Sequence, residues 1–258
     1  MTSETGFKQP LIVNRRLPFD LSKPRPLPGI APLEMAEWLH VDETYEQQMA
    51  LRRRLITERP QDVLAQSQSA GEAAEELLET VLQNLPPLSG KNPDHAAGAA
   101  LRFTSESQGS DLEKIGKIVQ EDFCILQKTD SEHVMTAAVL CFPASWMLME
   151  KINRPLTHIH GAVDEYDPNI AKRVQRLFDG VRPEKPLWRW NALWNDDPDL
   201  FQPRAVSDPR PPADPDTAPY LRCERQCILR LPETKAVVFS IHSFVLNRDD
   251  AMRAYCKT

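Results

Sequence analysis

Two histidines separated by one residue, His158 and His160, form the closest approach in this chain to a metal-binding pattern. Alternate residues of an extended loop point the same way, and Asp164 or Glu165 could supply a third ligand. The chain has no HExxH sequence and no CxxC pair, so the spacing alone does not favour a non-haem metal. The pair is a candidate for coordination chemistry whose cofactor the spacing leaves open.

Residues 222–226 are unusually polar for a predicted strand. Strand alternation places Arg222, Glu224 and Gln226 on one face and Arg225 on the other. Two interpretations stay open. The residues form a cross-strand ion pair at a sheet edge, or they bind an acid group such as a carboxylate or a propionate.

Three tryptophans alternate along another predicted strand, so Trp188, Trp190 and Trp194 share one face, while Arg189 lies on the opposite face. Aromatic rings at this spacing pack in a core more often than they form a wall for a planar cofactor. We therefore favour the packing interpretation.

The cysteines indicate a reducing compartment. Their number is five, which is odd, and most lie within apolar runs, so a disulfide framework is not expected. Cys223 and Cys227 have the wrong spacing for a zinc knuckle and are interpreted as structural thiols. The amino-terminal residues lack the layout of a secretory signal, and a cytoplasmic location is expected.

Charge and hydropathy narrow the classes of partner. The formal net charge of −6 gives no support to a nucleic-acid or anionic-membrane partner, because both favour basic patches. No apolar run approaches the roughly 18 residues that a membrane-spanning helix requires. Arg52, Arg53 and Arg54 lie within a predicted helix and are interpreted as an exposed charged face.

These residues are positioned by strands and helices in mixed order. Alternating apolar residues predict five strands, at about 119–127, 132–142, 186–195, 221–231 and 236–246. Helical spacing predicts helices over about 44–58, 70–85, 143–152, 168–181 and 247–258.

This order predicts an α+β fold. We expect a PAS-like curved antiparallel sheet of about five strands with helices on one face. Residues 1–110 are expected to form an extended and helical segment packed on a core of residues 111–258. Such a sheet would enclose a pocket.

Four strings carry a resemblance to a known family: QEDFCIL, CFPASWMLMEKI, IHGAVDEY and LRCERQCILRLPETKAVVFSIHSFV. Together they resemble the haem-binding (alpha) subunit of haem-dependent oxidative N-demethylases, over roughly residues 30–248. The resemblance implies a PAS-like domain that holds haem b and demethylates a small amine such as dimethylamine with O₂. It also implies electrons from a separate flavin and iron–sulfur reductase subunit.

The resemblance also implies an iron ligand. His160 of the IH string is the expected axial ligand, with His158 and His242 as fallbacks. A neutral imidazole whose other N–H is held by a carbonyl or carboxylate suits a haem iron.

Further roles follow from the same resemblance. Arg222 and Arg225 suit the haem propionates. A carboxylate together with an aromatic ring is the minimum for holding a methylammonium ion. The expected carboxylates are Glu224 and Asp164, and the expected rings are Tyr166 and Trp190.

Two other classes of protein remain open at this point. One is a PAS-like sensor or binding protein that holds haem or another ligand without catalysis, and the other is a haem-free structural subunit. A Soret absorption band separates the last from the rest, and amine-dependent oxygen consumption separates the enzyme from the sensor.

Overall fold

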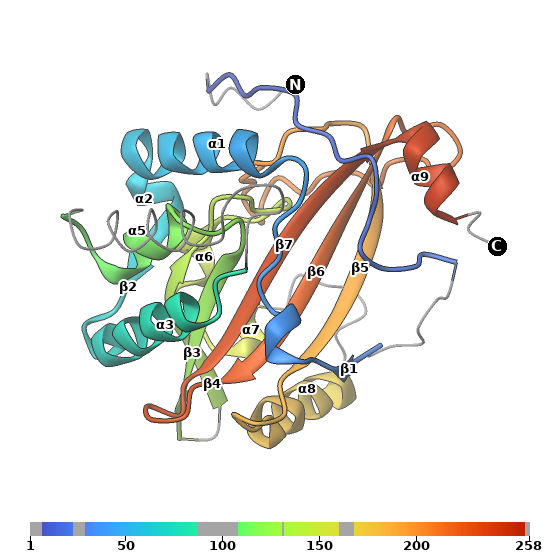
Figure 1. Ribbon diagram of the computed structural model, residues 1–258. Helices are drawn as coiled ribbons and strands as arrows, with labels where there is room; N and C mark the ends of the chain where they lie inside the picture. Colours follow the sequence, from blue (N-terminus) through green and yellow to red (C-terminus); the bar gives the residue numbers. More distant parts are fainter. Residues whose placement is uncertain (1–6, 23–28, 87–107, 131, 160–167, 256–258) are drawn as a thin grey trace.

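The computed structural model describes residues 7–22, 29–86, 108–130, 132–159 and 168–255 (Figure 1). A single antiparallel sheet of seven strands, in the order β1-β5-β6-β7-β3-β4-β2, runs through this part of the chain. The strands are β1 (Ala31–Pro32), β2 (Leu64–Gln66), β3 (Asp122–Thr129), β4 (Glu132–Val139), β5 (Leu187–Asn195), β6 (Tyr220–Arg230) and β7 (Val237–Asn247).

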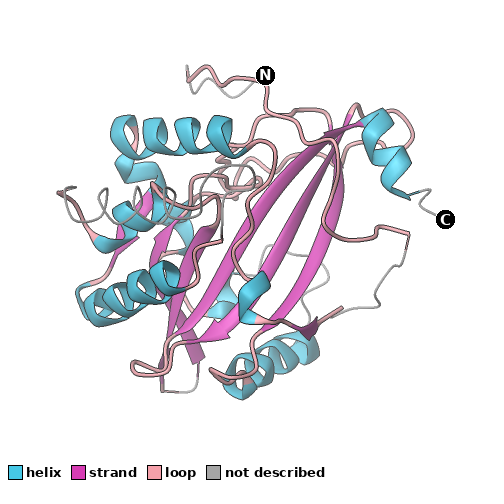
Figure 2. Ribbon diagram, in the orientation of Figure 1, coloured by secondary structure: helices cyan, strands magenta, loops and turns pink. Residues whose placement is uncertain are grey.

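Helices surround the sheet, as Figure 2 shows. The α-helices are α1 (Tyr45–Glu58), α2 (Pro60–Val63), α3 (Gly71–Gln83), α5 (Asp111–Gly116), α6 (Leu148–Lys151), α7 (Leu156–Ile159), α8 (Pro168–Gly180) and α9 (Arg248–Tyr255). Two short 3₁₀ helices, η1 (Met35–Glu37) and η2 (Gln68–Ala70), complete the described elements. The predicted α+β class is confirmed, and all five predicted strands are present as β3 to β7.

The sheet has two faces, which we name after the helices that cover them. The α1 face carries the side chains of Arg225, Cys227, Ser240 and His242, and the α8 face carries those of Arg222, Glu224, Gln226 and Phe239. The register sets this division, because directly opposite residues of paired strands share a face. Arg225 lies opposite His242, and Gln226 lies opposite Ile241.

Helices cover both faces, so the prediction that they lie on one face is wrong. On the α1 face, α1, α3 and α5 bury Leu55, Leu77 and Ile115 in one cluster with Ile125 and Val139 of the sheet. On the α8 face, apolar residues of α6, α7 and α8 form a second cluster with Leu126, Ile228 and Val237. The reason lies in β3, β4 and β7, whose apolar residues point both ways and need cover on both sides.

Two strands escaped prediction because they are too short to show an alternating pattern. The two residues of β1 pair with β5 and the three residues of β2 pair with β4, so both add to the sheet from residues before 110. Trp38, from the same part of the chain, is buried in the main core against Phe123. The expected boundary at residue 110 stays a prediction.

Arg52 corrects another expectation. Its side chain is fully buried, whereas Arg53 and Arg54 are exposed as predicted. The guanidinium of Arg52 donates to Asp122 Oδ1 at 2.7 Å and to the main-chain carbonyls of Gly116, Gln120 and Glu121. It therefore ties α1 to the start of β3.

The helix expected from Pro143 begins later, at Leu148. The main chain before it is engaged by other parts of the fold: Phe142 N–H donates to Asp122, and Ser145 N–H donates to the carbonyl of Gln202. Ser145 also has a positive φ of 61°, which is incompatible with a helix. No helix in the described part of the chain has both the length and the apolar composition needed to cross a membrane.

Candidate functional site

The sheet divides the residues that the sequence singled out. Arg222 and Glu224 lie on the α8 face, while Arg225, Trp190 and His242 lie on the α1 face. Period-two alternation had separated Arg225 from Glu224, and the structure has this arrangement. A single ligand therefore cannot contact all of these side chains, because the sheet lies between the two groups.

Four further predicted residues belong to α7 or follow it in the sequence. His158 is an exposed residue of α7, whose Leu156 is buried in the cluster on the α8 face. His160, Asp164 and Tyr166 lie outside the described residues. Their expected roles remain predictions.

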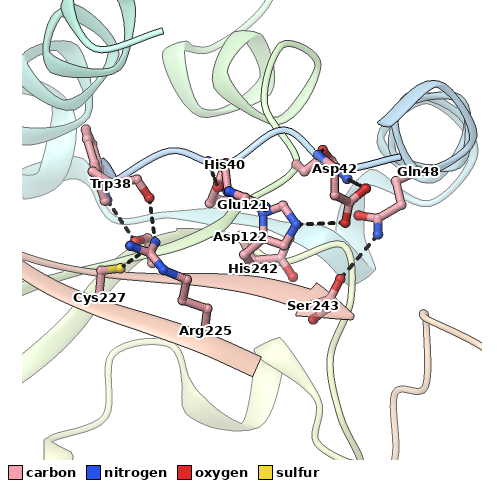
Figure 3. A network of polar contacts seen from close by, with 12 residues as sticks. Trp38, His40, Asp42, Gln48, Glu121, Asp122, Arg225, Cys227, His242 and Ser243 are labelled. Atoms are coloured by element: carbon pink, nitrogen blue, oxygen red, sulfur yellow. Dashed lines mark hydrogen bonds and ion pairs between the residues drawn. The ribbon is translucent and has the colours of Figure 1, made fainter. Parts of the chain in front are cut away.

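His242 sits in a buried network on the α1 face (Figure 3), in which Glu121 Oε2 has no hydrogen-bond partner among the described residues. Its Nδ1 is 3.0 Å from Glu121 Oε1 and its Nε2 is 3.2 Å from Asp42 Oδ2, and the side chain is 1 % exposed. Both ring nitrogens face carboxylates, so both carry protons and neither is available to a metal in this arrangement. Sequence reasoning had no signal for this network, because its members are far apart along the chain.

The surroundings shift the titration of this network. Burial alone lowers the pKa of His242, but the hydrogen bonds with Asp42 and Glu121 outweigh it and raise that pKa to about 9. Burial raises the pKa of Asp42, but the bonds with His242 and its neighbours hold that pKa far below its usual range. His40 packs edge-on against His242, and burial lowers its pKa, with the His242 charge adding to the effect. The network is thus an imidazolium held between carboxylates.

The network fastens the N-terminal segment to the sheet. Asn14 Nδ2 donates to Asp42 Oδ2 at 2.7 Å, while Asn14 Oδ1 accepts from Val245 N–H at 3.1 Å. His40 N–H donates to Glu121 Oε1 at 2.7 Å. These contacts join residues before α1 to one another, to β7 and to Glu121 just before β3, so the arrangement is one that positions chain segments.

Arg225 also holds a chain segment against the sheet. Its guanidinium donates to the carbonyls of Glu37 at 2.6 Å and Trp38 at 2.9 Å, and it lies over the ring of Trp188 at 5.2 Å. Trp190 likewise stacks on Phe19, with ring centroids 5.4 Å apart. These contacts agree with the packing interpretation of the tryptophan face.

The α8 face carries a different set of charges. Arg222 donates to the carbonyls of Phe142 at 2.6 Å and Leu200 at 3.1 Å, and its Nε is 3.6 Å from Glu224 Oε1. Gln226 donates to Glu224 Oε2 at 3.0 Å. The Glu224 side chain is 13 % exposed, so a carboxylate is held by two neighbours yet still reaches solvent.

Arg189 stands opposite Gln226 on this face, and sequence reasoning gave it no role. Its Nε is buried, and no described residue accepts a hydrogen bond from it. Burial lowers the pKa of the Arg189 guanidinium, and the charge of Glu224 offsets part of that effect. A half-buried cation with an unused donor is suited to an anion.

Apolar side chains adjoin these charges. Leu187 precedes Arg189 by two residues and lies opposite Ile228, which in turn lies opposite Phe239. Leu187 and Phe239 are partly buried and pack against the cluster of the α8 face, as do Trp146 and Ile159. An apolar surface bordered by a few convergent charges is the usual composition of a cofactor or ligand site.

The described residues give little support for a reactive thiol or for a site that binds a metal ion directly. Cys124, Cys141, Cys223 and Cys227 are free and buried, and burial raises the pKa of the Cys227 thiol to about 11. Among the residues that the structure describes, no three His, Cys, Asp or Glu side chains lie close enough to hold a metal ion.

A comparison with known protein families identifies the family of the chain. The sequence model of the family described as haem-dependent oxidative N-demethylase, alpha subunit-like, matches residues 29–254. The match extends from just before β1 into α9 and includes every strand of the sheet.

Proposed function

Because the chain belongs to the haem-dependent oxidative N-demethylase alpha subunit-like family, we propose that it binds haem b and oxidises a small N-methylated amine such as dimethylamine. In the balanced reaction, the amine, O₂, two electrons and two protons give the demethylated amine, formaldehyde and water. A separate flavin and iron–sulfur reductase subunit supplies the electrons. Haem, when bound, supplies the reductive activation of O₂.

The observation that carries the proposal is the incompletely paired charge on the α8 face. Haem needs an apolar surface for its ring and cations for its propionates. The partly buried Leu187 and Phe239 offer the former, and Arg189, with a buried Nε that no described residue satisfies, offers the latter. The described residues of this face therefore fit haem.

We assign propionate binding to Arg189, with Arg222 on the same face four residues further along the strands, and give Arg225 a structural role. The donors of Arg225 are directed to the carbonyls of Glu37 and Trp38 on the opposite face of the sheet. Arg222 also donates to main-chain carbonyls, but its Nε faces the charged cluster next to Glu224. The Nε atoms of Arg189 and Arg222 both lack a hydrogen-bond partner among the described residues, and Arg189 is the less buried of the two.

Glu224 is the proposed anchor for the cationic amine. Gln226 and Arg222 hold the two carboxylate oxygens, so the side chain is oriented before a substrate arrives. Partial burial strengthens its attraction for an ammonium ion relative to an exposed carboxylate, because the local dielectric is lower. Oriented charge of this kind places the reacting methyl group.

The remaining roles rest on the family. We propose His160 as the axial iron ligand, with His158 as the fallback, and Asp164 and Tyr166 as further contacts to the amine. These residues follow α7 or belong to it, and α7 packs on the α8 face through Leu156. We also propose that the curved sheet is PAS-like.

The test is a visible spectrum of protein expressed with ample haem, before and after dithionite, followed by a formaldehyde assay with dimethylamine, O₂ and a flavin/iron–sulfur reductase. We expect a Soret band, its loss in His160→Ala, and formaldehyde formation that depends on the amine. Absence of a Soret band after haem reconstitution would overturn the proposal. Haem binding without formaldehyde would support the sensor class instead.

A further inference from the structure

Within the described chain, the outer edge of β5 pairs with another strand only at its first two residues. The strand order places β1 beyond β5, but β1 pairs only with Leu187 and Trp188. Residues 189–195 therefore have no strand neighbour on that side within the described chain, and Figure 1 shows β5 at this margin of the sheet. An edge of this kind presents main-chain donors and acceptors to another chain.

The hydrogen bonds of β5 show which of its residues direct their main-chain N–H and C=O groups away from β6. Leu33 N–H donates to the carbonyl of Pro186 at 2.9 Å, so residue 186 directs its main-chain groups away from β6. In an antiparallel ladder this direction alternates, and Trp190, Ala192 and Trp194 therefore point outward as well. No described residue hydrogen-bonds the main-chain groups of these three residues.

The sequence of this edge lacks the residues that usually prevent an edge strand from pairing with another chain. Natural edge strands are commonly blunted by lysine, proline or inward charges. Residues 189–195 contain one charged residue, Arg189, and no proline. Leu193 is 68 % exposed, the largest exposed fraction among the large hydrophobic residues described.

We propose that β5 pairs with β5 of a second copy of this chain, antiparallel, about a two-fold axis at Ala192. The open stretch is itself symmetric about that residue, with three residues on each side between the end of β1 at Trp188 and the end of β5 at Asn195. A two-fold axis requires a surface that is complementary to itself. The two ends of the open stretch therefore fix the register of the proposed pairing, with Ala192 at its centre.

This register is favourable for the side chains. Trp190 lies opposite Trp194 of the second copy, which makes two aromatic cross-strand pairs flanking the small Ala192. Arg189 lies opposite Asn195, and the two copies of Arg189 are separated by six residues, about 20 Å along the strands. Leu193 becomes a diagonal neighbour of its own copy. No like charges meet directly.

The first test is the mass of the protein in solution, measured by light scattering for the wild type and Ala192→Pro. The N–H of Ala192 points outward, so proline there removes an intermolecular donor and leaves the β5–β6 ladder intact. We expect the wild type at twice 29.3 kDa and the variant at 29.3 kDa, with a melting temperature equal to that of the wild type diluted until it is monomeric. Asn191→Pro is the matched control, because its N–H points to β6 and its loss lowers the melting temperature.

Two outcomes would overturn the proposal. One is a wild-type monomer at about 100 µM, where a micromolar interface is saturated; the open edge would then be free for a different partner. The other is an Ala192→Pro variant that folds and stays dimeric.

A second measurement decides the question even if Ala192→Pro does not fold. At the two-fold axis the Cα atoms of residue 192 would be about 5.5 Å apart, within the disulfide range of about 4.4–6.8 Å. Mild oxidation should therefore convert Ala192→Cys to a covalent dimer and leave the wild type and Leu11→Cys, at a more exposed apolar position outside β5, unchanged. Equal cross-linking of the two variants, or none of Ala192→Cys, would contradict the proposed pairing.

Discussion

The two faces of the sheet treat charge in opposite ways. On the α1 face, His242, Asp42 and Glu121 are almost fully buried and bonded to one another. On the α8 face, Arg189 and Glu224 are only partly buried, and a donor of Arg189 has no partner among the described residues. Charged side chains are thus almost fully buried in a network on one face, where Glu121 Oε2 lacks a partner among the described residues, and only partly buried on the other.

The contrast shows how structural and binding charges can be told apart. A buried charge such as the His242 imidazolium, which has a carboxylate at each ring nitrogen, fixes the segments from which its partners come, and breaking it costs folding free energy. A half-buried charge with unused hydrogen-bonding capacity costs little to remove, and it retains an affinity for something from outside. We therefore expect variants on the two faces to affect different measurements.

The largest effect is expected from His242→Leu. It leaves Asp42 and Glu121 buried without their cation, and breaking a buried ion pair in this way costs about 3–5 kcal/mol. Urea unfolding should show a lower midpoint with an unchanged slope. The folded fraction should bind haem as the wild type does, and a loss of haem affinity without loss of stability would contradict the division of the faces.

The pH dependence of stability probes the same network. The pKa of His242 is raised from 6.5 to about 9 in the folded protein, so its contribution is complete below about pH 6.5 and is lost as the pH rises through 9. The loss amounts to about 3 kcal/mol at most.

Urea midpoints between pH 6 and pH 10 would measure this effect as the difference between the wild type and His242→Leu. That difference should shrink on the alkaline side. A difference that is constant with pH would mean that the imidazole is not charged in the folded state.

On the α8 face, Arg189→Leu should weaken haem binding about tenfold, equivalent to about 1.4 kcal/mol. The free energy of unfolding should change by no more than about 0.5 kcal/mol, because the buried Nε of Arg189 makes no hydrogen bond within the described chain. Haem titration followed by Soret absorbance measures the first quantity, and urea unfolding measures the second. Arg53→Leu, an exposed arginine of α1, is the matched control and should change neither.

The smallest effect is expected from Glu224→Gln, which keeps the shape of the side chain and removes its charge. The KM for dimethylamine should rise about fivefold, equivalent to about 1 kcal/mol, while haem affinity stays the same. Formaldehyde release at varied amine concentrations measures the effect. An unchanged KM would remove Glu224 from substrate binding.

Much of the fold could be predicted from the sequence because its long elements are strongly periodic. The predicted ranges for β5, β6 and β7 agree with the structure to within a residue, and α1 and α8 are also close. The alternation in 222–226 also put Arg225 on the opposite face from Glu224, as the register shows. Local patterns are sufficient where each element repeats its burial regularly.

The features that could not be predicted depend on contacts between residues that are far apart in the sequence. Arg52 was expected on an exposed face, but carbonyls of α5 and of the turn before β3, more than sixty residues later, surround it. His242 and Asp42 are 200 residues apart in sequence, and no spacing rule joins them. The sequence offers no reason to single out Arg189, because what distinguishes it is a buried Nε without a partner in the described chain, and only the structure shows this.

The most direct test substitutes one arginine from each face by leucine, Arg189 and Arg225, and measures haem affinity and unfolding free energy for both. We predict about tenfold weaker haem binding with unchanged stability for Arg189→Leu. For Arg225→Leu we predict haem affinity equal to that of the wild type and a stability loss of about 1–3 kcal/mol, from the unpaired carbonyls of Glu37 and Trp38. The reverse pattern, with haem binding weakened only by Arg225→Leu, would contradict the account.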